Sequence, residues 1–356
     1  MAEAEVHAAL SRALEGADTL VFELDLDAPH RFIIFSDTHK GARDRADEFE
    51  RCEPAYAAAL RDYRERGFSL ILLGDVEELW EQGFRKVEKN YAELMRFEAE
   101  FGAGRYYRVW GNHDDDWMDP HLVRSRLVPY MPTAAVYEGI RIAACASGEP
   151  VGTLFLVHGH QGTFGSDRIR PVSRLFLRWI VRPLQRLGLP IGKSTPAKDA
   201  CLRGQHDREM YHWAEKQEKL ILVAGHTHRP VWSSRTHLQK LEADLKAAET
   251  ASSAGTPDGQ ARIAELRAAV EERCRLSPPC NDLPGGGLVG CYFNTGCCRF
   301  EDGDITGIEL EDGVLRLVKW TSGSATAEPP LTRMVLEDGD LAAFFRALPR
   351  EPGKKG

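Results

Sequence analysis

The chain has 356 residues, of which 43% are hydrophobic and 28% are charged, and its formal net charge is −8 at pH 7. This length can bury a sizeable core, as one large domain or two small ones, and the composition is that of an ordinary globular protein. The negative net charge argues against a general nucleic-acid binder, so we expect no nucleic-acid partner.

The N-terminus and the cysteines indicate the compartment. Residues 1–16 are rich in Ala and Glu and lack the basic start and apolar run of a secretory signal. No uncharged apolar stretch approaches the roughly 18 residues needed to span a bilayer. The eight cysteines form no CxxC pair and suggest neither a zinc finger nor a disulfide framework. We therefore expect a protein of the reducing cytoplasm.

In chain order, a short helix is expected over residues 4–15, and helical patterns follow at 44–66 and 84–101. Five continuous apolar runs predict buried strands, and each run ends in polar residues. These are 31–36 with Asp37-Thr38-His39, 70–73 with Gly74-Asp75, 106–110 with Gly111-Asn112-His113-Asp114, 151–157 with His158-Gly159-His160, and 220–224 with Gly225-His226-Thr227-His228. Such strands, separated by helices, predict an α/β fold with its ligand site at the carboxyl ends of the strands.

Two inserts interrupt this pattern within what we expect to be a single domain over residues 1–356. Residues 161–218 predict a helical, basic insert between the fourth and fifth polar clusters. Residues 236–275 predict two charged helices around a turn at 252–259, which is a helical hairpin. The chain then returns to strands at 288–295, 305–310 and 314–319, with a final helix near 338–347.

The first insert is interpreted as a lid. Arg174, Arg178 and Arg182 recur every four residues and could line one helix face. They would then bind the anionic or lipidic part of a substrate, and the lid could contact lipid or a membrane surface. The alternative is a solvated basic face over a stripe that packs on the core. The position of the insert, between two polar clusters, favours the lid.

The polar clusters, in the order D-x-H, G-D, G-N-H-D, H-G-H and G-H-x-H, resemble the calcineurin-like metallophosphoesterase superfamily over residues 31–320. The resemblance implies a two-sheet α/β sandwich flanked by helices. It also implies two divalent metal ions with Asp75 as the bridging carboxylate. One metal would be held by Asp37, His39, Asp75 and His228, and the other by Asp75, Asn112, His158 and His226.

The same resemblance gives roles to three residues beside the metals. His113 would contact the substrate or the leaving oxygen without binding a metal, and Asp114 would orient His113. His160 would contact the substrate or a metal-bound water, although a structural role fits it as well. Any one of these histidines alone would more often be a surface or core residue, and it is the five ordered clusters that favour a site. Nitrogen and oxygen ligands suit Mn, Fe, Zn or Co, of which we favour Mn.

The function implied is that of a dinuclear metal-dependent phosphoesterase, which hydrolyses a phosphodiester or related phosphate ester through a metal-activated hydroxide. One alternative is a pyrophosphate hydrolase for a sugar-nucleotide or lipid-linked substrate. The chain is similar to the UDP-2,3-diacylglucosamine pyrophosphatase branch, but His113 stands where that branch has Arg. Another alternative is a non-catalytic scaffold that binds a partner through the 236–275 hairpin. The hairpin could also join copies of the chain in a homo-oligomer.

Overall fold

The structure is a computed structural model that describes residues 3–162, 200–251, 254–276, 283–284, 288–321 and 331–349. Its helices are α1 (Glu3–Glu15), α2 (Glu53–Glu65), α3 (Phe84–Ala99), η1 (Asp115–Met118), α4 (Pro120–Leu122), η2 (Val123–Leu127), α7 (Ala200–Ala214), α8 (His237–Thr250), α9 (Pro257–Leu276) and α10 (Leu341–Ala347). Its strands are β1 (Thr19–Asp25), β2 (Arg31–Phe35), β3 (Ser69–Leu73), β4 (Tyr106–Val109), β5 (Val136–Tyr137), β6 (Gly139–Ala146), β7 (Glu149–Val157), β8 (Leu220–Ala224), β9 (Val231–Trp232), β10 (Arg235–Thr236), β11 (Tyr292–Asn294), β12 (Ile305–Glu311), β13 (Val314–Thr321) and β14 (Thr332–Asp340).

Among the described residues, the strands form two seven-stranded sheets, which confirms the predicted two-sheet α/β architecture. One sheet has the order β1-β6-β7-β8-β11-β9-β10 and the other the order β14-β13-β12-β2-β3-β4-β5. β2, β3 and β4 are parallel neighbours in one sheet, and β7, β8 and β11 are parallel neighbours in the other. Their carboxyl ends therefore carry all five polar clusters predicted from the sequence.

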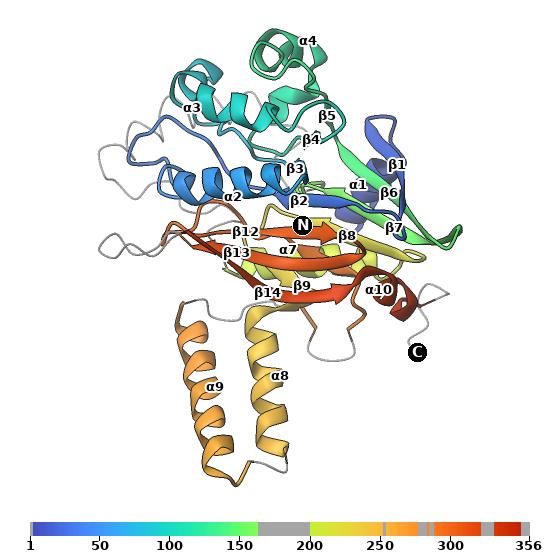
Figure 1. Ribbon diagram of the computed structural model, residues 1–356, viewed down its shortest axis with the longest axis vertical. Helices are drawn as coiled ribbons and strands as arrows, with labels where there is room; N and C mark the ends of the chain where they lie inside the picture. The colour runs from blue at the N-terminus through green and yellow to red at the C-terminus, as the bar shows by residue number, and fades with distance from the viewer. Residues whose placement is uncertain are drawn as a thin grey trace.

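Two apolar cores hold the layers together. One contains Ile34 and Ile71 of one sheet, Leu222 of the other, and side chains of α1 and α7. The second lies where α2 and α3 cover one sheet, and it includes Phe35 and Tyr56. The sheets therefore lie in the middle of the molecule with helices outside them (Figure 1). Because each buried strand is apolar on both faces, it is held from both sides and its end is fixed in place.

Several elements differ from the sequence prediction. The helix expected from residue 44 begins only at Glu53, with Pro54 in its first turn, where the missing amide hydrogen of proline leaves no bond unmade. β1, β6 and β14 were not expected, because their alternating burial gives no continuous apolar run. The strand expected over 288–295 is reduced to β11, and residues 338–340 belong to β14 rather than to the last helix.

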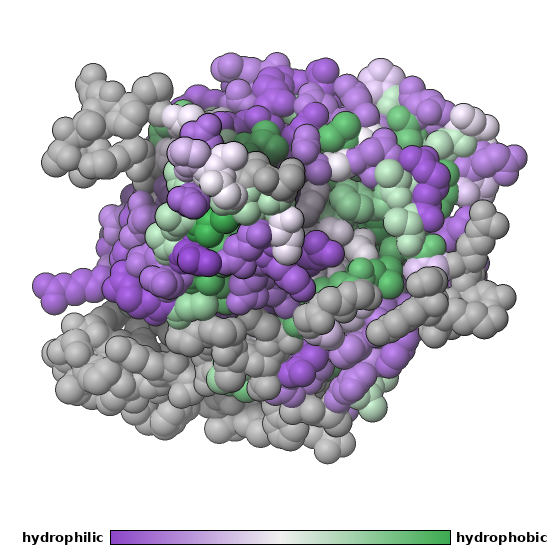
Figure 2. Space-filling model, turned by 90° about the horizontal axis from the view of Figure 1, so that it is seen from below, coloured by the Kyte–Doolittle hydropathy of each residue, from purple (hydrophilic) through white to green (hydrophobic). Residues whose placement is uncertain are grey.

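The hairpin predicted over 236–275 is present. α8 and α9 stand side by side and project away from the two sheets (Figure 1). A capping box at Thr236 and Gln239 fixes the start of α8. Hydrophilic residues cover much of the face from which the hairpin projects, and hydrophobic residues gather there in smaller patches (Figure 2). No helix within the described ranges is long and apolar enough to cross a membrane.

The first insert is described only in part. Its residues 200–214 form α7, which packs against α1, β8 and β11 and belongs to the body of the fold. Arg174, Arg178 and Arg182 lie outside the described residues, so the lid stays a prediction. The sequence suggested no disulfide framework, and Cys52, Cys145, Cys274, Cys291, Cys297 and Cys298 are free.

Candidate metal centre

The polar clusters meet at one place, where the carboxyl ends of the two sheets converge. Metal-binding side chains form three groups there, and the candidate ligand atoms of each group lie within 4.8 Å of one another. The groups are Asp37 with His39 and His228, His39 with Asp75 and His113, and Asp75 with His158 and His226. His39 and Asp75 each belong to two groups, so the three groups form one continuous cluster with the Asp75 carboxylate inside it.

The backbone at these strand ends is unusual. Five of the candidate ligands have a positive φ, which non-glycine residues adopt rarely: Asp37, His39, Asp75, His226 and His228. Such conformations cluster at functional sites because the surrounding fold must hold them against their strain. Gly111 and Gly74 allow the loops to approach closely, since a Cβ at Gly111 would clash with the Asp75 carboxylate and one at Gly74 with the His158 ring.

The imidazoles are oriented by hydrogen bonds on their second nitrogen. Nδ1 of His158 lies 2.9 Å from the carbonyl oxygen of Leu73, to which it donates its hydrogen. Nε2 then carries the lone pair with which the ring can bind a metal. That Nε2 lies 3.2 Å from Oδ2 of Asp75. On the other side, Nε2 of His228 lies 3.0 Å from Oδ1 of Asp37. The rings therefore point their open nitrogens toward the two carboxylates at the centre.

Glu78 was not among the residues singled out from the sequence, and it orients two rings of the site. Its carboxylate lies 2.9 Å from Nδ1 of His39 and 2.9 Å from Nδ1 of His113. Both imidazoles can donate to it, which leaves both Nε2 atoms facing the centre. The signal was present in the run Gly74-Asp75-Val76-Glu77-Glu78, but nothing in the sequence showed which of the two glutamates faces the site.

Asp114 does not orient the His113 ring as the resemblance implied. Its Oδ2 accepts from the amide of Val76 at 2.7 Å, and its Oδ1 accepts from the amide of Gly111 at 2.6 Å. The buried guanidinium of Arg108 lies 3.6 Å from the same carboxylate. Asp114 thus ties the loop after β3 to the loop after β4, and it acts on the position of Asp75 and of residues 111–113 rather than on a ring.

Burial and charge set the protonation of these groups. Although burial acts to raise the pKa of Asp37 and of Asp75, neighbouring histidines lower it overall, so both carboxylates are ionised at neutral pH. Burial lowers the pKa of His228 to about 4 and that of His226 well below its ordinary value. Burial also acts to lower the pKa of His113, but Glu78 and Asp75 outweigh it and raise the pKa to about 9.

The residues fit a pair of divalent metal ions. Nε2 of His39, Nε2 of His226 and Oδ1 of Asn112 are buried and have no hydrogen-bond partner among the described residues. Buried polar atoms are nearly always paired, so three such atoms in one place need an explanation. A bound cation supplies it, because each atom offers a lone pair to the same centre. Imidazole, amide and carboxylate donors are typical of Mn, Fe, Zn and Co sites.

Helix α7 fixes the loop that carries His226 and His228. Its buried Asp207 accepts from Oγ1 of Thr227 at 3.0 Å, from the guanidinium of Arg229 at 2.7 Å, and from the hydroxyl of Tyr292 at 2.8 Å. His206, on the same helix, has its ring centroid 5.1 Å from that of His226 and bonds to the carbonyl of Gly159. No motif in the sequence indicates either role, because both depend on where α7 packs.

His160 and Trp80 complete the surroundings. The His160 ring is buried, 5.4 Å from the ring of His158 and 4.9 Å from that of Trp110. It therefore lies beside the ligand groups without belonging to one of them. Trp80 stacks on His113 with 5.1 Å between ring centroids. An indole in this place limits the movement of the His113 ring.

Comparisons with solved structures give low sequence identity. A predicted phosphoesterase from Streptococcus pneumoniae TIGR4 is 13% identical, with 86% of this chain and 98% of that chain covered and a TM-score of 0.29. Vacuolar Protein Sorting 29 from Cryptosporidium parvum is 11% identical, with 87% and 100% covered and a TM-score of 0.30. No curated protein matches the chain.

The family model for calcineurin-like phosphoesterases matches residues 30–230. This match covers more than half of the chain and includes all five polar clusters. It begins one residue before β2 and ends two residues after His228, so it contains every candidate ligand named above. The chain belongs to the calcineurin-like phosphoesterase family.

Proposed function

We propose that this chain is a dinuclear metal-dependent phosphoesterase that hydrolyses a phosphodiester or a related phosphate ester. One observation carries the proposal: the buried Asp75 carboxylate lies between the two ligand sets, 3.5 Å from Nε2 of His39 and 3.2 Å from Nε2 of His158. In the proposal, Asp37, His39, Asp75 and His228 hold one metal. Asp75, Asn112, His158 and His226 hold the other. Two bound divalent ions, with Mn favoured, would activate water and neutralise the charge of the phosphate.

The chain's own residues would position the substrate and move a proton. The amide of His113 donates to Oδ1 of Asp75 at 2.7 Å, so the position of His113 is tied to the proposed bridge. Its Nδ1 bonds to Glu78, and its Nε2 is free to give a proton to the leaving oxygen. The Glu78 carboxylate acts to raise the pKa of the ring, which favours the protonated form that a general acid requires. His160, 6.5 Å from His226 between ring centroids, would contact the substrate.

His113→Ala tests this role. The variant should keep its metals and lose about 10²–10⁴-fold in turnover, which is the usual cost of losing a general acid. The loss should grow with the pKa of the leaving alcohol, because a nitrophenolate departs without a proton and an alkoxide does not. Turnover is measured over a series of leaving groups, with metal content checked by elemental analysis.

The matched control is His121→Ala, since His121 is exposed on α4 and lies outside every ligand group. A deficit that is independent of leaving-group pKa would show that His113 acts on phosphate charge and not as the acid. If wild-type protein loaded with Mn hydrolyses no phosphate ester, the phosphoesterase proposal is wrong and the binding scaffold of the sequence analysis takes its place.

The remaining sequence predictions stay predictions. They are the pyrophosphate substrate, the lid contacts of Arg174, Arg178 and Arg182, the homo-oligomer through the hairpin, and the cytoplasmic location.

A further inference from the structure

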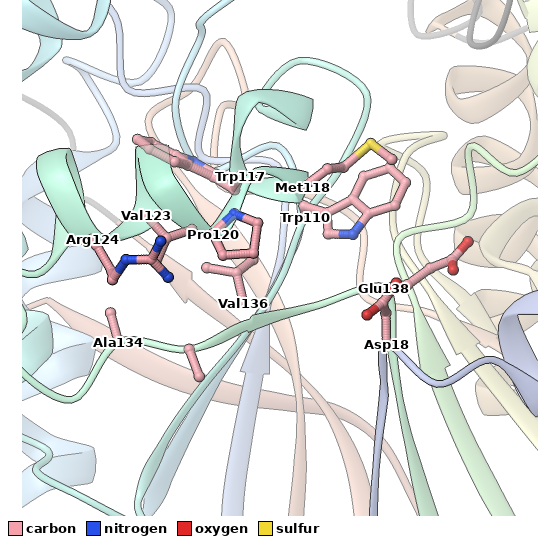
Figure 3. A pocket seen from close by; sticks show the side chains of 11 residues that line it. Asp18, Trp110, Trp117, Met118, Pro120, Val123, Arg124, Ala134, Val136 and Glu138 are labelled. Carbon is pink, nitrogen blue, oxygen red and sulfur yellow. The ribbon is translucent and has the colours of Figure 1, made fainter.

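A pocket of 440 Å³ lies beside the candidate metal centre. Its walls come from the strand end and the short helices on either side of the Gly111-Asn112-His113 loop (Figure 3). Trp110 precedes that loop, and Trp117 and Met118 follow it in η1. This volume is within the usual range for sites that bind small organic molecules, roughly 300–1,000 Å³.

The two ends of the pocket differ in chemistry. Asp18 and Glu138 lie at one end with Trp110 and Met118, and Arg124 lies at the other end (Figure 3). An ionised carboxylate only accepts hydrogen bonds, whereas a guanidinium only donates them. The first end therefore suits a group rich in hydroxyl donors that also has an apolar face. The second end suits an acceptor such as a carbonyl oxygen.

Two side chains lie between the pocket and the centre. The ring of Trp110 lies 4.9 Å from that of His160, and the ring of His160 lies 5.4 Å from that of the candidate ligand His158. The carboxylate end is the end that contains Trp110. If a molecule with its phosphate at the centre extends past these two rings, the first part of the pocket that it meets is the carboxylate end.

We propose that this pocket binds the sugar ring of a phosphate ester, with ring hydroxyls donating to Asp18 and Glu138 and an apolar ring face against Trp110 and Met118. Met118 is 48% exposed and so offers apolar surface to a ligand. The sugar could be that of a glycosyl phosphate ester or that of a nucleoside. In a nucleoside, the base would reach the Arg124 end. The proposal rests on the proposed function for the position of the phosphate, but the pocket itself can be tested without catalysis.

Binding of neutral sugars is the first test. Methyl β-glucoside and uridine are titrated into chelator-treated full-length protein and followed by saturation-transfer NMR. Ala135→Trp should weaken binding at least tenfold, because Ala135 is exposed and lines the pocket, so an indole there fills it. Asp18→Asn, at an exposed position, should weaken binding without affecting the fold. Ala247→Trp, on the exposed face of α8, is the matched control and should leave binding unchanged.

Each outcome is decisive. Binding of both sugars, lost in Ala135→Trp, supports a general sugar site, and binding of uridine alone identifies the sugar as that of a nucleoside. In the second case Arg124→Gln should also weaken binding. Binding of neither sugar, or binding that Ala135→Trp leaves unchanged, overturns the proposal.

Kinetics separate this inference from the proposed function. In the Mn-loaded enzyme, the ratio of kcat/KM for a sugar-bearing nitrophenyl phosphodiester to that for methyl nitrophenyl phosphate should fall at least tenfold in Ala135→Trp. An unchanged ratio means that the pocket does not serve the substrate. Absence of hydrolysis of either ester in wild-type protein would instead contradict the proposed function and leave the binding test to decide on the pocket.

Discussion

Glu78→Gln should weaken metal binding although Glu78 is not a proposed ligand. The Glu78 carboxylate lies 2.9 Å from Nδ1 of His39 and 2.9 Å from Nδ1 of His113, and it also accepts from the amide of Glu81 at 3.2 Å. The glutamine side chain has nearly the same shape, but only its oxygen accepts. Its amide nitrogen donates and cannot receive a hydrogen from a ring. One of the two rings must therefore lose its acceptor.

The size of the effect follows from these contacts. Loss of a carboxylate that supports a metal-binding histidine typically costs about 10–100-fold in metal affinity. In free energy this is about 1.4–2.8 kcal/mol. The loss should fall on the metal that His39 helps to hold, because the histidines around the other metal are supported elsewhere, as His158 is by Leu73. The two sites should therefore respond unequally.

Metal affinity is measured by competition with a chromogenic chelator, and two binding steps are resolved. Glu93→Gln is the control, because Glu93 is exposed on α3 and faces away from the site. We expect one step weakened in Glu78→Gln and neither in Glu93→Gln. Two unchanged steps in Glu78→Gln, together with turnover equal to that of the wild type, would refute the reasoning, since they would mean that neither the His39 ring nor the His113 ring needs this carboxylate.

Two further predictions concern stability and thiol reactivity. Asp207→Ala should lower the free energy of unfolding by about 3–5 kcal/mol, because it leaves Arg229 without its buried partner. A urea titration measures this loss, and Asp62→Ala, which breaks a more exposed ion pair, is the control. A loss in Asp207→Ala no larger than that in the control would contradict the prediction. Burial raises the pKa of Cys52 and of Cys291 to about 12, so at pH 8 both remain neutral thiols. Iodoacetamide should label them only after unfolding, as read by mass spectrometry, and rapid labelling of native protein would show that these thiols are exposed.

The sequence predicted the parts of the fold that local pattern determines. β3 and β8 are short, mainly apolar runs, as is β2 after Arg31, and a run that is buried on both faces is visible without knowledge of its neighbours. β6 was missed because its burial alternates, and β14 because it is largely exposed. The late start of α2 shows the same limit, since a helical pattern does not locate the turn at which a helix begins.

The candidate site likewise has a part that the sequence predicts, the ligands, and a part that it does not, the residues that support them. Each proposed ligand lies within four residues of the end of a strand, so the place of that strand in the sheet largely determines the place of the ligand in the site. Glu78, His206 and Asp207 lie in loops and on a helix, and their roles come from packing that no motif records. The expected Asp114–His113 pair failed for a related reason: residues adjacent in sequence at a strand end need not point the same way. The Asp114 carboxylate turns back to the backbone amides of Gly111 and Val76.

The central claim is that Asp75 bridges two metals, and metal stoichiometry tests it most directly. Wild-type protein, Asp75→Asn and His228→Ala are loaded with Mn, desalted and analysed for bound metal per chain. The account predicts two metals in the wild type, chiefly one lost in His228→Ala, and both weakened together in Asp75→Asn, because Asp75 is the one residue that the proposal assigns to both metals. Two tightly bound metals in Asp75→Asn would contradict it.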